Sequence, residues 1–115
     1  MSAIQAATTS EVTREQIRLY AEAVGDFNPM HLDDEFAKKA GLPSVIAHGP
    51  LTVALVIDVL VAQLGVSALR GFEARLRAPV FPGDRLEVVQ TENGIEARKS
   101  DGTVVISATV DVEES

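Results

Sequence analysis

The chain has 115 residues, a length that fits one domain with a single hydrophobic core. Its 17 acidic and 10 basic residues give a net charge of −7, which argues against nucleic acid or an anionic membrane as a partner. The absence of cysteine excludes disulfides, a thiol nucleophile and a thiolate metal site, and it is compatible with a reducing cytoplasm.

The start of the chain predicts a short arm followed by a helix. Residues 1–12 are small and polar, and we expect them to form a loose arm or a short first strand; we see no signal peptide there. Thr13 and Gln16 have the spacing of a capping box, with Thr13 as N-cap and Gln16 reaching back. Apolar residues then recur at helical spacing up to Gly25, which ends the helix: Ile17, Tyr20, Ala21 and Val24.

The next stretch holds a carboxylate and an imidazole on either side of a proline. Asn28-Pro29 predicts a turn, because the residue before a proline is disfavoured in helical geometry. We therefore expect Asp26 and His31 on opposite arms of a short turn, where the two side chains can share one water molecule. Such a pair is the minimum equipment for moving a proton to or from a substrate.

A second, short helix follows, with Asp33 as its cap, acidic residues at its start and Lys38-Lys39 at its end. Gly41 and Pro43 end it, and residues 42–47 are expected to be extended up to His48. His31 and His48 are the two histidines of the chain.

Residues 49–65 predict the central helix, with Pro50 at its first position and Gly65 at its end. Its side chains are apolar nearly all round, so it must be buried on most faces. In a domain of this size, only a sheet curled around it together with a partner subunit can cover it. The apolar run at 51–62 is broken by Thr52 and Asp58 and is too short to span a membrane.

The remaining residues predict consecutive antiparallel strands, at 72–78, 84–92, 95–99 and 104–112. Asn93-Gly94 is expected to form a two-residue hairpin turn, and Asp101-Gly102 the next turn. Strands that follow helices in this way indicate an α+β domain, which we expect to span residues 1–115.

Taken together, several stretches resemble the MaoC-like family of (R)-specific enoyl-CoA hydratases and dehydratases, which have the hot-dog fold. They cover residues 13–112 and occur in the family's order: Tyr20-Ala21, Gly25-Asp26-Phe27-Asn28-Pro29-Met30-His31-Leu32-Asp33, Phe36-Ala37, Gly41, Ile46-Ala47-His48-Gly49 and Ala78-Pro79-Val80-Phe81-Pro82-Gly83-Asp84. Two positions differ from the pattern. Pro50 stands where many relatives have methionine, and Ile57 where some have a serine that supports the site.

The resemblance implies an antiparallel sheet wrapped around a long central helix, in a homodimer or a hot-dog heterodimer. It also implies a hydro-lyase of fatty acid metabolism that needs no cofactor or metal. The enzyme would hydrate trans-2-enoyl thioesters of coenzyme A or acyl carrier protein, or dehydrate (3R)-hydroxyacyl thioesters.

By the same resemblance, Asp26 and His31 hold and activate the water. The backbone N–H of Gly49 polarises the thioester oxygen at the positive end of the central helix. Asn28 and His48 support the site, with His48 packing or bonding locally rather than transferring protons.

Other readings remain open. Asp58 is an exposed or interface carboxylate, or the acidic residue of a hot-dog thioesterase. The chain could instead be the partner subunit of a heteromeric dehydratase.

A metal site built from His31, His48, Asp33 and Asp34 has suitable ligands, although the family pattern argues against it. Six basic residues are candidates to meet the carrier's phosphates, and the sequence selects none of them: Arg70, Arg75, Arg77, Arg85, Arg98 and Lys99.

Overall fold

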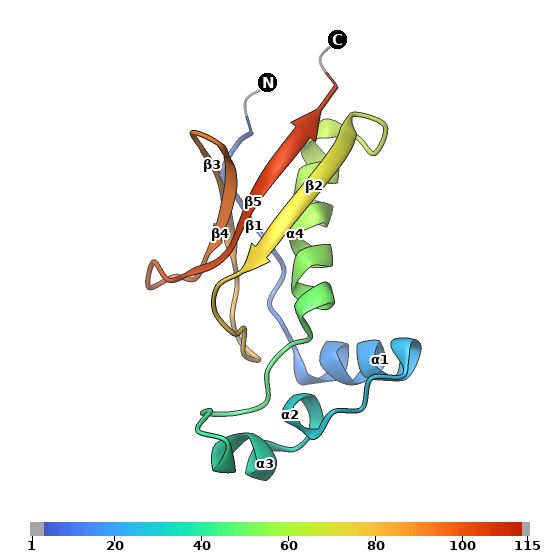
Figure 1. Cartoon of the computed structure of the whole chain (residues 1–115), viewed down its shortest axis with the longest axis vertical. Helices are drawn as coiled ribbons and strands as arrows, with labels where there is room; N and C mark the ends of the chain where they lie inside the picture. The colour runs from blue at the N-terminus through green and yellow to red at the C-terminus, as the bar shows by residue number, and fades with distance from the viewer. Residues whose placement is uncertain (1–3, 114–115) are drawn as a thin grey trace.

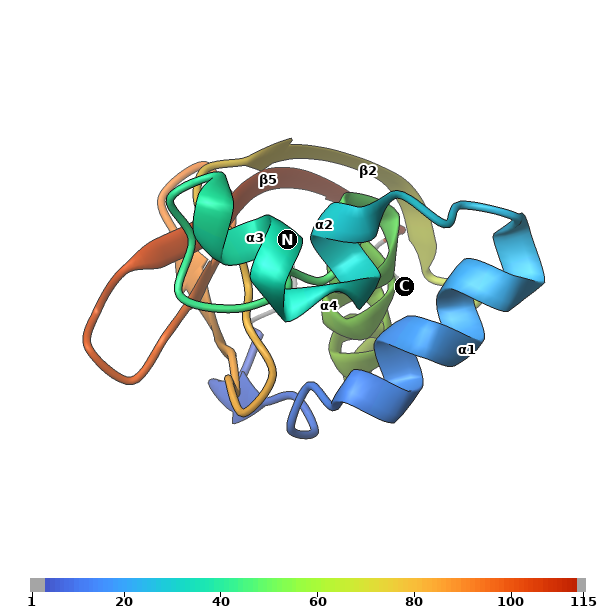
Figure 2. The ribbon, with the colours of Figure 1, turned by 90° about the horizontal axis from the view of Figure 1, so that it is seen from below.

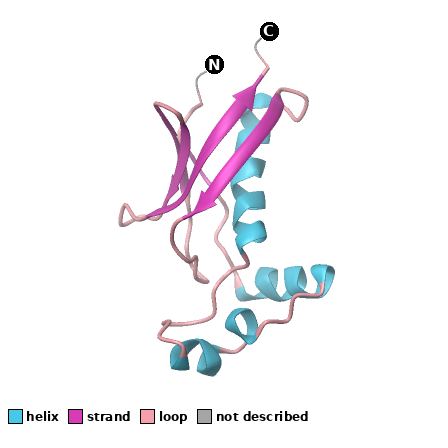
Figure 3. Cartoon of the chain, viewed as in Figure 1, coloured by secondary structure: helices cyan, strands magenta, loops and turns pink. Residues whose placement is uncertain are grey.

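The computed structural model describes residues 4–113, in which five strands form an antiparallel sheet of order β1-β3-β4-β5-β2 (Figure 1). In chain order the elements are β1 (Ala7–Thr8), α1 (Arg14–Val24), α2 (Pro29–Leu32), α3 (Asp34–Lys39), α4 (Gly49–Leu64), β2 (Leu69–Leu76), β3 (Glu87–Thr91), β4 (Gly94–Arg98) and β5 (Val104–Val112). Figure 3 separates the two classes of element: the strands lie together at one end of the molecule, and α1–α3 lie at the other.

The long helix α4 lies against the sheet, which curves around it when the molecule is seen along the helix (Figure 2). Buried side chains of α4 and of the strands form one core: Leu51, Leu55, Val56, Leu60, Leu86, Val88, Ile95, Ala97, Val105 and Ile106. Many β-branched residues lower the helix propensity of this segment by a few tenths of a kcal/mol each. Burial contributes about 1.5–3 kcal/mol for each large apolar side chain, so packing decides the conformation. The predicted α+β hot-dog arrangement is confirmed.

The hairpin between β3 and β4 differs from the prediction by one residue. Thr91 pairs with Gly94, so the turn consists of Glu92 and Asn93, and Gly94 is the first residue of β4. Gly94 lacks a positive φ. A glycine is needed there for a different reason: a Cβ would lie 2.0 Å from the carbonyl oxygen of Ala108 on β5.

The expected strand at 84–92 also begins later, at Glu87, because the preceding backbone bonds to the N-terminal segment instead. Thr9 N–H donates to Leu86 O at 2.8 Å and Val12 N–H to Asp84 O at 2.9 Å. Within the described residues the N-terminal segment therefore includes a short edge strand, β1, paired with β3. Residues 1–3 of the predicted arm lie outside the described part of the chain.

Most of the predicted helix caps are confirmed. Thr13 accepts from Gln16 N–H at 3.0 Å, Gly25 ends α1 in the left-handed conformation, and Asp33 caps α3. The second half of the capping box is not formed, since Gln16 Oε1 is buried without a partner among residues 4–113. None of the helices in this range combines the length and apolar character needed to cross a bilayer.

The prediction of a non-helical turn at Asn28-Pro29 is wrong, because a short helix begins there. Residues Pro29–Leu32 make one turn of helix, α2, with Asn28 as N-cap accepting from Met30 N–H at 3.0 Å. A proline has no N–H to lose at the first helical position, so it begins this helix rather than preventing it. His31 therefore lies on a helical turn, and Asp26 lies in the segment before it.

Candidate active site

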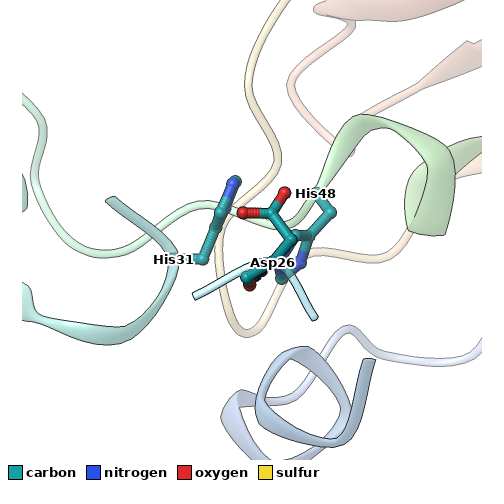
Figure 4. A group of neighbouring side chains, drawn as sticks. All are labelled: Asp26, His31 and His48. Atoms are coloured by element: carbon teal, nitrogen blue, oxygen red, sulfur yellow. Dashed lines mark hydrogen bonds between the residues drawn. The ribbon is translucent and has the colours of Figure 1, made fainter. Parts of the chain in front are cut away.

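Three side chains meet where the segment containing α1–α3 adjoins the start of α4. One carboxylate oxygen of Asp26 and one ring nitrogen of each of His31 and His48 all lie within 4.8 Å of one another (Figure 4). Asp26 is exposed, His31 is half-buried and His48 is 1% exposed. The structure thus brings together the predicted pair and adds the second histidine as a direct neighbour.

The His31 ring is oriented by a main-chain acceptor. Its Nδ1 lies 2.7 Å from the carbonyl oxygen of Ile46. Because a carbonyl can only accept, Nδ1 carries the proton and Nε2 of the neutral ring holds the free lone pair. The same two segments are joined again by Ile46 N–H donating to Met30 O at 3.0 Å. His31 consequently presents a base, Nε2, in a fixed orientation.

The carboxylate of Asp26 is placed by the end of α1 and by Asn28. The αL conformation of Gly25, with φ of 73°, turns the chain there, and Asp26 N–H donates to Ala21 O at 3.1 Å. Asp26 Oδ1 accepts from Asn28 N–H at 3.2 Å. The remaining lone pairs of the carboxylate are free to hold a water molecule. Asn28 thus contacts Asp26 through its backbone N–H and caps α2 with its side chain.

His48 is the N-terminal cap residue of α4 and is enclosed by the other site residues. Its Nε2 lies 3.2 Å from the carbonyl oxygen of Asp26. Its ring stacks on that of His31, with centroids 3.8 Å apart and an interplanar angle of 22°. The Tyr20 ring contacts the His48 ring from another side, tilted at 54° with centroids 4.9 Å apart. Nδ1 of His48 is buried without a partner among the described residues.

Gly49, the first residue of α4, borders a cavity of about 350 Å³ that His31 also lines, together with Ile46, Thr52, Leu76 and Val80. The hydrogen bonds of α4 begin with Thr52 N–H donating to His48 O, so the Gly49 N–H has no acceptor within the helix. A Cβ on Gly49 would lie 2.5 Å from Leu76 Cδ1. The cavity therefore has a base on one wall and a helix N-terminus on another.

Asp58 and most of the candidate basic residues lie elsewhere. Asp58 is exposed on α4, nine residues beyond Gly49 or about 13 Å along the axis, and does not line this cavity. Of the six basic candidates, Arg77 alone borders the cavity. Three others are paired with carboxylates: Arg70 with Glu113, Arg98 with Glu96 and Lys99 with Asp84.

The ligand set considered for a metal is not assembled. Asp33 accepts from the N–H groups of Glu35 and Phe36, and Asp34 bonds to Arg14 and to Val45 N–H. Asp26 takes their place as the carboxylate beside the two histidines.

Two contributors to the site were not found from the sequence. The acceptor on Ile46 is a main-chain carbonyl, which every residue has, so no side-chain pattern identifies it. The position of Leu76 over Gly49 depends on contacts between residues distant in sequence, which local spacing does not encode.

Comparison with known proteins gives consistent results. A family model described as "MaoC like domain" matches residues 2–114. A UPF0336 protein of Saccharopolyspora erythraea is 37% identical over 109 residues, which cover 87% of this chain and 70% of that protein. The 3-hydroxyacyl-thioester dehydratase Y of Mycobacterium tuberculosis is 41% identical over 88 residues, which cover 71% of this chain and only 30% of that protein.

Among solved structures, the R-hydratase PhaJ1 from Pseudomonas aeruginosa matches with a TM-score of 0.77 and 26% identity. The match covers 97% of this chain and 81% of that one.

Proposed function

This chain belongs to the MaoC-like domain family, and on that premise we propose that it adds water to trans-2-enoyl thioesters and removes water from (3R)-hydroxyacyl thioesters. The observation that carries the proposal is that His31 and Gly49 border one cavity, with Asp26 beside His31. Relatives named as a 3-hydroxyacyl-thioester dehydratase and an R-hydratase support the reaction class and the stereochemistry.

In the proposed hydration step, one water molecule lies between the Asp26 carboxylate and Nε2 of His31. The pair removes one proton from the water as its oxygen bonds to C3 of the enoyl group. The π electrons of the C2–C3 double bond move towards the thioester, and the proton is returned to C2. Dehydration is the same sequence reversed, so atoms and charge balance without a cofactor.

Gly49 acts on the charge that develops during this step. As water attacks C3, negative charge grows on the thioester oxygen. A backbone N–H at the N-terminus of a 16-residue helix is fixed in advance and carries partial positive charge. A fixed donor of this kind stabilises the transition state more than the ground state, and loss of one costs about 10²–10³ in rate in other enzymes.

The substrate class in this proposal is an acyl thioester of coenzyme A or of acyl carrier protein. The apolar lining of the cavity by Leu76, Ala78 and Val80 fits an acyl chain. We propose that the chain acts in the cytoplasm, as a homodimer or with a second hot-dog chain. The match covers only 30% of the dehydratase from Mycobacterium tuberculosis, so the assembly of this chain with a second one is our proposal.

The direct test is to mix the protein with crotonyl-CoA and follow the loss of enoyl absorbance, with chiral analysis of the product. The proposal predicts (3R)-hydroxybutyryl-CoA. The same protein is then mixed with saturated butyryl-CoA, and free coenzyme A is measured with a thiol reagent. Release of coenzyme A, with no hydration of crotonyl-CoA, would reject the proposal in favour of a thioesterase that uses Asp58.

A further inference from the structure

We propose that His48 is a positioning residue that holds the His31 ring and the Asp26 main chain in place relative to Gly49, without itself exchanging a proton with substrate. The inference rests on the proposed function. It is drawn from contacts that His48 makes with three separate parts of the site.

The first contact is through Nε2, which donates to the carbonyl oxygen of Asp26 at 3.2 Å. Asp26 lies in an exposed segment between α1 and α2. Figure 4 shows the His48 ring reaching to the backbone of Asp26. This bond therefore fixes the residue whose carboxylate holds the water, although 22 positions separate the two residues in sequence.

The second contact is the stack of the His48 ring on the His31 ring, with centroids 3.8 Å apart. The Tyr20 ring also contacts the His48 ring, tilted at 54° with centroids 4.9 Å apart. The Nδ1 bond to Ile46 leaves the His31 ring able to pivot about that bond. The His48 ring, stacked along the face of the His31 ring, prevents this rotation. His48 thus restrains the direction in which Nε2 of His31 points.

The third connection is to α4. The main-chain oxygen of His48 accepts from Thr52 N–H at 3.1 Å and from Thr52 Oγ1 at 3.2 Å, so His48 is anchored to the first turn. Gly49 is its neighbour in the chain. One residue thereby connects the Asp26–His31 pair to Gly49, which borders the same cavity as His31.

The burial of His48 argues against a proton-transfer role. The ring is 1% exposed, and its Nδ1 has no partner within residues 4–113. With Nε2–H donating to Asp26 O, the neutral ring keeps its lone pair on Nδ1. His48 also does not line the cavity that His31 and Gly49 border, so its ring does not face the place proposed for the substrate.

Two substitutions separate the contacts. His48→Gln keeps a side-chain donor of similar reach and removes the ring, whereas His48→Phe keeps a ring and removes the donor. We expect each to lower kcat for crotonyl-CoA by about tenfold or more while KM changes by less than about threefold, because misplacing reacting groups slows the chemical step. Val56→Ala, in the buried part of α4 outside the cavity, is the control: it lowers the melting temperature and leaves kcat unchanged.

Non-additivity distinguishes positioning from a general loss of stability. In a His31→Ala background, the ring on which His48 stacks is absent, so adding His48→Gln, which removes the stacked ring and keeps a donor, should lower kcat by less than about threefold. A full tenfold further loss would overturn the proposal. So would a folded His48→Phe and a folded His48→Gln that both retain the wild-type kcat.

An NMR measurement that does not depend on turnover tests the positioning role of His48 separately from the proposed enzymatic function. The NMR signals of the His31 ring protons should shift in His48→Gln, which removes the stacked ring, and shift less in His48→Phe. If wild-type protein fails to hydrate crotonyl-CoA, the proposed function fails while this measurement still tests the stack. Unchanged His31 signals in folded His48→Gln would overturn the positioning role.

Discussion

Nδ1 of His31 lies 2.7 Å from the main-chain oxygen of Ile46, 15 residues further along the chain. This bond sets the tautomer and leaves the lone pair on Nε2, in a ring that lies beside Asp26 and borders the cavity. Many catalytic histidines are oriented by a carboxylate side chain, whereas here the acceptor belongs to the backbone. The orientation of the His31 ring therefore depends on the path of the extended segment that leads into α4.

Gly49→Ala tests the backbone donor. We expect turnover to fall by more than about tenfold, because a methyl group would intrude where the thioester oxygen approaches the N–H. The fold should survive, since the close neighbour is the end of a half-exposed side chain, Leu76 Cδ1 at 2.5 Å. Activity and thermal melting are measured on the same preparation.

A second variant separates two causes of that loss. Leu76→Ala in the Gly49→Ala background removes the clash between the two side chains but leaves the methyl group beside the N–H. We expect activity to remain low. Recovery to the Leu76→Ala level would show that displacement of Leu76, and not a blocked donor, caused the effect.

We predict that the chain is at least a dimer, with β2 at the interface. Within this chain β2 is an edge strand that pairs with β5 on one side only. Its last residue, Leu76, is 55% exposed, and Val53, Ile57 and Val61 of α4 are only partly buried. An unpaired edge next to apolar side chains favours pairing with another chain. Analytical ultracentrifugation at micromolar concentration measures the mass, and an active, stable monomer would contradict the prediction.

The contact between Arg14 and Asp34 predicts a small acid-dependent contribution to stability. The Arg14 guanidinium, 2.8 Å away, and the Val45 N–H lower the pKa of the Asp34 carboxyl below its ordinary value of 3.8. A carboxyl whose pKa is lowered on folding stabilises the native state above its unfolded pKa, and that contribution is lost as pH falls through the folded pKa.

Urea unfolding of wild type and Asp34→Asn at about pH 7 and at about pH 2.5 measures this contribution. The variant should be less stable than wild type at the higher pH, and the difference should shrink at the lower pH. A difference that stays constant between the two conditions would show that the charged form of Asp34 does not contribute.

Gly94→Ala tests the close approach of β4 and β5. A Cβ would lie 2.0 Å from Ala108 O, a backbone atom that cannot move aside alone. We expect the free energy of unfolding to fall by about 2–3 kcal/mol, as for other overpacked sites. Gly71→Ala on β2 is the matched control, because its Cβ would lie 3.4 Å from Asp111 Cβ, and it should be nearly neutral. Equal effects in both variants would contradict this explanation.

The elements with strong local patterns could be predicted from the sequence. The span of α4, from Gly49 to Leu64, follows from its apolar residues between Pro50 and Gly65, and Thr13 and Asp33 cap their helices as their side chains suggest. The proximity of Asp26 and His31 was also predictable, because only a few residues separate them.

Other features depend on competing rules or on distant contacts. Pro29 both disfavours helix before it and favours a helix starting at it, and the second effect determines α2. Gly94 looked like a turn residue, but its backbone neighbour on β5 explains it better. The stacking of His48 on His31 joins residues 17 positions apart, which no local spacing encodes.

The shared water between Asp26 and His31 is the central claim, and a double-mutant cycle tests it most directly. The kcat for crotonyl-CoA hydration is measured for wild type, Asp26→Asn, His31→Ala and the double variant, all checked for folding by circular dichroism. Because both groups act on one water, we expect each single change to lower kcat by about 10² or more and the double change to cost little beyond that. Losses that multiply, so that the double variant falls by the product of the two single effects, would contradict the shared water.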